Sequence, residues 1–241
     1  MTQTNTNCKI IVITSGKGGV GKTTTTANIG AGLAMKGYKV ALIDTDTGLR
    51  NLDLLLGLEN RIMYDLVDVT SGKIPYKKAL VRHKKYETLF LLPTSQTKDK
   101  LAVSPEQVVT LCSKMSADFE FILIDCPAGI EQGFKTAVAA ADIALVVTMP
   151  EISAVRDADK IIGELNRADK ENILLIVNRI RPDMVAKGEM LDLDDINDIL
   201  AIKCIGQIPD DEMVVSSTNR GEPVIANTKS QAGIAYQNIT R

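Results

Sequence analysis

Short apolar segments recur along the chain, separated by stretches whose apolar residues follow a helical spacing. The segments are rich in Ile, Val and Leu and nearly continuous, as strands buried on both faces are. They span residues 10–14, 40–44, 89–92, 121–125, 143–148, 173–178 and 202–208. Alternation of strands and helices predicts right-handed crossovers and a mostly parallel sheet with helices on both faces. The expected fold class is α/β, with a twisted sheet of about seven or eight strands, in a single domain over residues 1–241.

Two helices can be bounded from the sequence. The first is expected over residues 22–36, with Gly37 placed to end it in the left-handed conformation. The second is expected to begin after Ser104, because Ser104 and Gln107 have the spacing of a capping box and Pro105 suits the first turn.

Polar and glycine-rich stretches follow the predicted strands at their carboxyl ends. They cover residues 15–24, 44–53, 125–129 and 178–182. Because ligands of parallel α/β sheets bind at the carboxyl ends of the strands, these stretches predict one site built by several loops.

The first of these loops reads SGKGGVGKTTTT and matches the phosphate-binding pattern GxxxxGK[ST] between a strand and a helix. Its backbone amides and the following helix dipole favour bound phosphate. Lys22 is expected to bind the β- and γ-phosphates, and Thr23 to bind Mg²⁺. A turn that merely packs a strand against a helix is the alternative. The expected nucleotide contacts here are Gly16, Lys17, Gly18, Gly19, Val20, Gly21, Lys22, Thr23 and Thr24.

Carboxylates at two other strand ends are candidates for the metal and water side of the site. Asp125 ends the apolar run FILID and is expected to hold Mg²⁺ through water. Cys126 follows it where a fast ATPase of this type carries a glutamate base, so another loop has to orient the attacking water. Asp44 is expected to hold metal-bound water and Asp46 to orient the attacking water, with turn formation as the alternative. A loop with that task predicts a switch with slow, state-dependent hydrolysis.

The late strand ends indicate adenine rather than guanine. A guanine-specific protein of this build carries an aspartate in an NKxD pattern, and here the stretch from Asn178 reads NRIR. We expect Asn178 and Arg179 near the base, with Pro209 and Asp211 closing over it, and therefore ATP and Mg²⁺ as cofactors.

Composition excludes several other classes. With 28 Lys and Arg against 30 Asp and Glu, the net charge of −2 gives no general attraction to nucleic acid. Four cysteines without a C-x-x-C pair indicate neither a zinc site nor a disulfide framework and suit a reducing, cytosolic compartment. No apolar run reaches the length of a membrane span, and the first residues do not resemble a signal peptide.

Longer motifs carry a family resemblance. KGGVGKTT resembles the loop of the deviant Walker A ATPases of the ParA/MinD family. GLRNLDLLLGLENRIMYDLVDV, DCPAGIEQGF, PEISAVRDADKIIG, VNRIRPDM and STNRGEP resemble its MinD members, the division-site ATPases. The similarity extends from about residue 9 to the last residue, nearly the whole chain.

The resemblance implies a catalytic cycle and partners. ATP is expected to join two subunits face to face, with Lys17 reaching the partner's phosphates as an arginine finger does in trans. The dimer is expected to bind membrane, to recruit the inhibitor MinC and to be dissociated when MinE stimulates hydrolysis. The region of Arg50 and Asp157 is similar to the family's partner-binding surface. The implied location is cytoplasmic with cycling to the inner face of the membrane, or the plastid stroma for a plastid protein.

Two features depart from the family pattern. Thr47 stands where relatives more often carry an aliphatic residue, which is expected to alter packing of the switch loop. Family members finish with a basic amphipathic membrane-binding helix, and the last residues here, AGIAYQNITR, do not predict one.

Three rival functions make different demands on the sequence. A DNA-partitioning ATPase needs a basic face, for which residues 76–86 are the one candidate; we expect them to form a solvated helix face with His83 exposed, and no nucleic-acid partner. An iron–sulfur reductase of the nitrogenase type needs cluster ligands, and Cys112 and Cys126 lack the spacing. A small-molecule kinase needs an arginine-bearing lid, which no stretch resembles.

Overall fold

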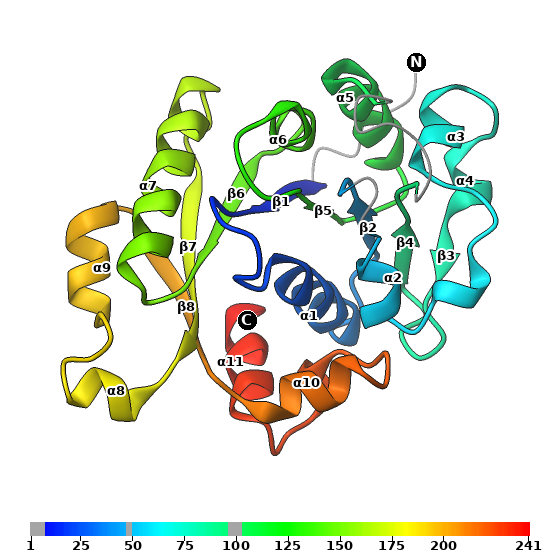
Figure 1. Cartoon of the computed structure of the whole chain (residues 1–241). Helices are drawn as coiled ribbons and strands as arrows, with labels where there is room; N and C mark the ends of the chain where they lie inside the picture. The colour runs from blue at the N-terminus through cyan, green and yellow to red at the C-terminus, as the bar shows by residue number, and fades with distance from the viewer. Residues whose placement is uncertain (1–7, 47–49, 96–102) are drawn as a thin grey trace.

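A computed structural model describes residues 8–46, 50–95 and 103–241. An eight-stranded sheet runs through the molecule, with helices on both faces (Figure 1). The strands lie in the order β3-β4-β2-β5-β1-β6-β7-β8, and β3 with β4 is the one antiparallel pair among them. Their bounds are β1 Lys9–Thr14, β2 Val40–Asp44, β3 Val81–Arg82, β4 Leu89–Leu92, β5 Phe121–Asp125, β6 Ile143–Thr148, β7 Ile173–Ile180 and β8 Lys203–Pro209. The predicted fold class is confirmed.

The helices fill the connections between the strands. They are α1 Lys22–Met35, α2 Leu52–Leu55, α3 Leu66–Thr70, α4 Tyr76–Ala79, α5 Pro105–Met115, α6 Gln132–Val138, α7 Ile152–Arg167, α8 Pro182–Ala186, α9 Leu193–Leu200, α10 Glu212–Thr218 and α11 Gln231–Ile239. Two 3₁₀ turns, η1 Glu59–Arg61 and η2 Val224–Ala226, complete the described elements. None of the helices among the described residues is both long and apolar enough to span a membrane.

Local signals in the sequence set the helix boundaries that were predicted. Gly37 has φ 90° after the end of α1, a conformation that favours glycine. Ser104 caps α5, its side chain accepting from Gln107 N while the Gln107 side chain accepts from Ser104 N. The capping box is therefore confirmed.

Two apolar layers hold the helices on the sheet. Successive residues of a buried strand point to opposite faces, so Val12 belongs to one layer and Ile13 to the other. The first layer receives side chains of α5, α6, α7 and α9, and the second those of α1, α2 and α11. Central strands buried on both faces explain why their segments lack polar alternation.

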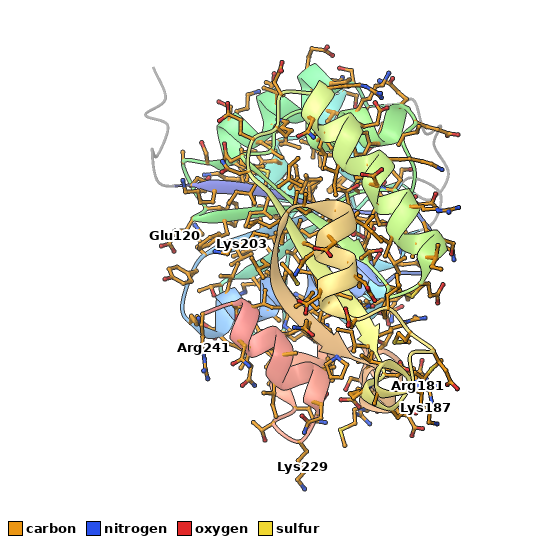
Figure 2. All side chains as sticks on the ribbon, turned by 90° about the vertical axis from the view of Figure 1, so that its left-hand side faces the viewer. Glu120, Arg181, Lys187, Lys203, Lys229 and Arg241 are labelled. Atoms are coloured by element: carbon orange, nitrogen blue, oxygen red, sulfur yellow. The ribbon has the colours of Figure 1, made fainter. Side chains whose placement is uncertain are left out.

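The sheet brings the predicted loops to one edge. β1 lies between β5 and β6, and Asp125 at the end of β5 is in register with Ile13 of β1 and with Asp44 of β2. Figure 2 shows the two ends of the sheet: Glu120 and Lys203, where strands begin, lie on the opposite side of the molecule from Arg181, beyond the end of β7.

The prediction for residues 76–86 is wrong. The stretch contains the short helix α4 and then β3, which pairs with β4. His83 is buried, its Nδ1 accepting from the backbone N–H groups of Lys85 and Tyr86 at 3.1 Å each, and its ring stacks on Tyr86 at 4.8 Å. The charged residues of this stretch predicted an exposed helix face, but pairing of β3 with β4 forms a hairpin instead. His83 is buried in that hairpin and has a structural role.

Candidate functional site: a phosphate loop at the carboxyl edge of the sheet

The glycine-rich loop runs from the end of β1 to the start of α1. Gly19 and Gly21 have φ of 80° and 101°, so both positions favour glycine. A Cβ placed on Gly18 or Gly19 would meet nothing within 4 Å, which leaves that side of the loop open. Val20 is 1% exposed and anchors the loop in the core below α1.

Two neighbouring elements clamp the closed side of the loop. Asn178, in β7, donates from Nδ2 to the Val20 carbonyl at 2.7 Å, and a Cβ on Gly21 would lie 2.3 Å from that nitrogen. A Cβ on Gly16 would lie 2.2 Å from the carbonyl oxygen of Asp157 in α7. The glycines at these two positions therefore let the backbone approach β7 and α7.

Lys22 points into this loop. It is 8% exposed, and its Nζ donates to Ser15 Oγ at 2.9 Å. Ser15 Oγ donates in turn to the Lys17 carbonyl at 2.8 Å. The ammonium is therefore held against the phosphate loop by Ser15, as suits a phosphate-binding lysine.

Lys17 points away from the loop that carries it. Its side chain is 41% exposed, and its Nζ lies 3.5 Å from Glu151 Oε2 and 3.3 Å from Ser153 Oγ, just before and within the first turn of α7. The two lysines of the motif thus have separate surroundings within one subunit.

Asp125 lies beside the start of α1. Its Oδ1 accepts from Thr26 Oγ1 at 3.0 Å, and Thr23 hydrogen-bonds to it as well. Burial raises the pKa of Asp125 to about 6, opposed by the Thr23 hydrogen bond and the positive charge of Lys22. A cation near Asp125 would favour the ionised carboxylate.

Asp44 and Asp46 extend this group of acids. Asp44 is 1% exposed, and burial followed by the charge of Asp125 raises its pKa well above the usual range. Its Oδ1 accepts from Asp46 N at 2.9 Å, which holds the start of the following loop against β2. Thr45 Oγ1 donates to the Asp125 carbonyl at 2.6 Å. Thr47 lies outside the described residues.

A cavity of about 270 Å³ opens beside the loop. It is lined by Gly21, Thr24, Asn178, Arg179, Pro209, Asp210, Asp211, Val214, Val215 and Tyr236. All four residues predicted for the base line it. Arg179 has φ 58°, an uncommon backbone conformation for a non-glycine residue, and its N–H donates to Asn178 Oδ1 at 2.9 Å.

Asp211 connects the start of α10 to the start of α11 through hydrogen bonds. Its Oδ1 accepts from Met213 N at 2.8 Å and caps α10, while Oδ2 accepts from Ser230 Oγ at 2.6 Å and from Ala232 N at 3.1 Å. These bonds occupy its acceptors, so Asp211 shapes the cavity through α10 and α11.

The residues predicted for partner contact belong to different elements, Arg50 preceding α2 and Asp157 lying in α7. Arg50 is 16% exposed and forms a 2.7 Å ion pair with the buried Asp53. Asp157 lies on α7, with its carboxylate 3.1 Å from Lys160. Its backbone contacts the phosphate loop at Gly16.

Sequence reasoning missed three side chains of this site. Ser15 contacts Lys22, Thr26 contacts Asp125, and Tyr236 lines the cavity with its hydroxyl 3.2 Å from Thr25 Oγ1. The threonine run after Lys22 was a usable signal for Thr26, since Lys22, Thr23 and Thr26 share one helix face. Nothing near Tyr236 in the sequence links it to the loop.

The donor set fits a magnesium nucleotide. Hydroxyl and carboxylate oxygens are ligands that Mg²⁺ prefers, directly or through water, and Thr23, Asp125 and Asp44 supply them. The open loop, the inward ammonium of Lys22 and the adjoining cavity would hold phosphates and a base. Fold and site together define a P-loop nucleotide-binding protein.

Comparison with known proteins narrows that class. Residues 11–224 match the model of the CobQ/CobB/MinD/ParA nucleotide binding domain. The chain is 54% identical over 235 residues to the septum site-determining protein MinD of Bacillus subtilis, covering 96% of this chain and 87% of that protein. It therefore belongs to the MinD family of septum site-determining proteins.

Solved structures agree. In the MinC:MinD cell division protein complex of Aquifex aeolicus, the matching chain is 50% identical with a TM-score of 0.91, over 97% of this chain and 95% of that one. MinD of Pyrococcus horikoshii, solved with Mg-ADP, is 29% identical with a TM-score of 0.86, over 97% and 94%. The resemblance read from the motifs is confirmed.

Proposed function

We propose that this chain is a Mg²⁺-dependent ATPase that acts as a dimerising switch and recruits a MinC-type inhibitor of division. The contrast between its two loop lysines carries the proposal. Lys22 lies inside the phosphate loop, whereas Lys17 extends outward to Glu151 and Ser153 on the surface beside it. A cation displayed at the rim of the loop suits a second subunit's phosphates better than its own.

The residues divide the chemistry among them. The loop amides and Lys22 bind the phosphates, and Asn178, Arg179 and Pro209 border the base. Mg²⁺, when bound by Thr23 and through water by Asp125 and Asp44, supplies charge neutralisation of the phosphates. Asp46, held beside Asp44 by its backbone N–H, orients the attacking water. Lys17 of the facing subunit stabilises the charge that develops on the phosphates.

Partner control follows from the position of α7. Aquifex aeolicus MinD forms a complex with MinC, which supports the same class of partner here. The region of Arg50 and Asp157 is the proposed contact surface, and a MinE-type activator is proposed to use it too. Because Gly16 touches the backbone at Asp157, a partner on α7 would act directly on the phosphate loop. We propose that the protein cycles between the cytoplasm and the inner membrane surface.

The DNA-partitioning alternative has less support. In the basic stretch on which it depends, the Lys77 ammonium is paired with Asp118 at 2.7 Å and Arg82 belongs to the edge strand β3. The charges are therefore dispersed over a hairpin rather than arranged on one helix face.

Gel filtration in ADP, in ATP and in a non-hydrolysable ATP analogue tests the switch. A monomer in ADP and a dimer in the analogue are expected, with the dimer in ATP decaying as ATP is consumed. A monomer under all three conditions, although nucleotide binds, would contradict dimerisation.

Lys17→Ala and Lys22→Ala form a matched pair in the same assay. Lys17→Ala is expected to bind ATP within a few fold of the unchanged protein and to remain monomeric, because Lys22 still binds the phosphates of its own subunit. Lys22→Ala is expected to lose about a hundredfold or more of its affinity, since a buried charge-assisted contact is removed. Equal losses of affinity in the two variants would rule out the role of Lys17 in trans.

A further inference from the structure

Ser15 lies where the two lysines of the loop meet. It is completely buried, at 0% exposure, directly after β1. Its hydroxyl accepts from Lys22 Nζ at 2.9 Å and donates to the Lys17 carbonyl at 2.8 Å. Its own carbonyl accepts from Gly129 N at 3.3 Å. The Ser15 side chain thus hydrogen-bonds to the Lys22 ammonium and to the Lys17 carbonyl. The Ser15 backbone hydrogen-bonds to Gly129, in the segment after β5.

The hydroxyl has a defined orientation because of these bonds. A serine has one O–H donor, and here the Lys17 carbonyl takes it. The oxygen lone pairs therefore face the remaining neighbour, the ammonium of Lys22. A buried ammonium needs such an acceptor, since an unpaired charge in the interior is costly.

Without the Ser15 hydroxyl, the Lys22 ammonium would pair with the carboxylate of Asp125, which is proposed to face Mg²⁺. Lys22 already acts electrostatically on Asp125, which is fully buried. An ion pair between them would draw Lys22 out of the loop and occupy the carboxylate proposed to face Mg²⁺. Both groups would have to be freed again before a magnesium nucleotide could bind.

The same hydroxyl fixes the backbone at Lys17. With its carbonyl turned toward Ser15, the Lys17 side chain extends to Glu151 and Ser153. The position of Lys17 therefore depends on Ser15 as well.

We propose that Ser15 is a positioning residue that holds Lys22 ready for phosphate and keeps it from pairing with Asp125, while it sets the loop so that Lys17 faces outward. This inference rests on the proposed nucleotide function and adds to it a residue outside the GxxxxGK[ST] pattern.

Three substitutions at Ser15 separate hydrogen bonding from shape. Ser15→Ala removes the hydroxyl, Ser15→Cys keeps the volume but offers a weaker donor and acceptor, and Ser15→Thr keeps the hydroxyl. Ser116→Ala is the matched control, because Ser116 is also buried and donates to a backbone carbonyl at 2.8 Å, at the end of α5 away from the loop. Calorimetric titration with a non-hydrolysable ATP analogue, with and without Mg²⁺, measures affinity, and phosphate release gives KM and kcat.

Ser15→Ala and Ser15→Cys are expected to weaken binding of the magnesium nucleotide about tenfold or more. Both should need more Mg²⁺ to reach half-saturation and should raise KM more than they lower kcat. Ser15→Thr and Ser116→Ala should stay close to the unchanged protein. The added methyl group of Ser15→Thr enters a buried position and can prevent folding. In that case the test is the affinity of Ser15→Cys compared with that of the unchanged protein.

Two results would overturn the inference. One is affinity within twofold of the unchanged protein for both Ser15→Ala and Ser15→Cys. The other is a loss that is the same with and without Mg²⁺ and is matched by Ser116→Ala. Failure of the unchanged protein to bind the analogue would instead refute the proposed function itself, so the two failures are distinct.

Discussion

Two carboxylates that face each other across neighbouring strands share one small buried space. Asp44 and Asp125 are register partners on β2 and β5, and both have raised pKa values, with burial as the first cause. Two buried negative charges this close repel each other and disfavour ionisation. The nucleotide-free site therefore holds more protons than these residues would hold in water, and a bound cation would release them.

His83 is a second buried titratable group, remote from the nucleotide loop. Burial, with the charges of Lys85 and Lys84, lowers its pKa below the usual value. Its Nδ1 already accepts two backbone N–H groups, so a proton there would oppose both donors. Its Nε2 is buried and has no hydrogen-bond partner among the described residues. The neutral ring is the form that fits the hairpin.

Stability is therefore expected to fall as the pH drops through about 6.5, the value for an unfolded histidine. Below that pH the unfolded chain binds a proton that folded His83 resists, so stability rises with pH across this window. His83→Asn keeps an acceptor for the two N–H groups and should reduce the loss between pH 7.5 and 5.5 by up to about 1.4 kcal/mol, the energy of a tenfold change in proton affinity. Urea unfolding of both proteins at the two pH values measures it.

His83 is the one histidine in the chain, so no other histidine contributes to the difference in pH dependence between the two proteins. Asp125, with its raised pKa, acts in the opposite direction and is present in both proteins, so it cancels in the comparison. An equal change in unfolding free energy in the two proteins would refute the role assigned to His83.

At this scale the sequence predicted the residues whose chemistry depends on spacing within one loop. Lys22 and Thr23 follow from the motif, and Asp125 from its place at the end of an apolar strand. Ser15 and Tyr236 could not be found this way, because hydrogen bonding to Lys22 and to Thr25 depends on folded geometry. The burial of His83 depends likewise on the hairpin that encloses it.

Among the elements, the phosphate loop and α7 are in close backbone contact at the site. The backbone at Gly16 leaves no room for a methyl group against the carbonyl of Asp157. Helix α7 also carries Ser153, the neighbour of Lys17. The loop and this helix are therefore packed directly against each other at two positions.

Gly16→Ala and Gly18→Ala should differ sharply in the stability of the nucleotide-free protein. Gly16→Ala has to displace α7 or the loop and is expected to cost about 1–3 kcal/mol, as overpacking does. Gly18→Ala places its methyl in open space and should cost little. Thermal unfolding without nucleotide measures both. Similar losses in the two variants would show that the contact with α7 is not tight in solution.

The strands and long helices were predictable because apolar runs and caps determine them locally. All seven predicted segments became strands, with bounds within two residues. Strand β3 was not predicted, because its two residues are ordered by pairing with β4 rather than by their own pattern. The same pairing explains why the basic stretch was misread as a helix face.

For the molecule as a whole, the order of the strands was the part that local patterns could not supply. Alternating strands and helices indicate a parallel sheet, but not that β1 lies between β5 and β6. That order depends on which apolar faces the helices cover together. It brings four loops to one edge, where dimerisation and hydrolysis are proposed to occur.

Asp46→Ala tests that coupling at the level of the assembled dimer. The variant is expected to bind ATP and dimerise but to lower phosphate release about hundredfold or more, since no residue would orient the water. Its dimer should therefore persist in ATP. Light scattering over time alongside phosphate release checks this.

Asp183→Ala, which removes an exposed aspartate 3.6 Å from Arg181, is the control and should behave as the unchanged protein. A short-lived dimer or normal phosphate release in Asp46→Ala would assign the water to another group.

The base cavity is lined by residues far apart in the sequence, among them Thr24 and Tyr236. During synthesis the phosphate loop is made early, but β1 can pair in the sheet only after β5 and β6 have been made. The cavity is complete only after α11 has been made. The complete nucleotide site therefore forms only after α11 has been synthesised. Before that point the chain has the phosphate-binding motif without the cavity beside it.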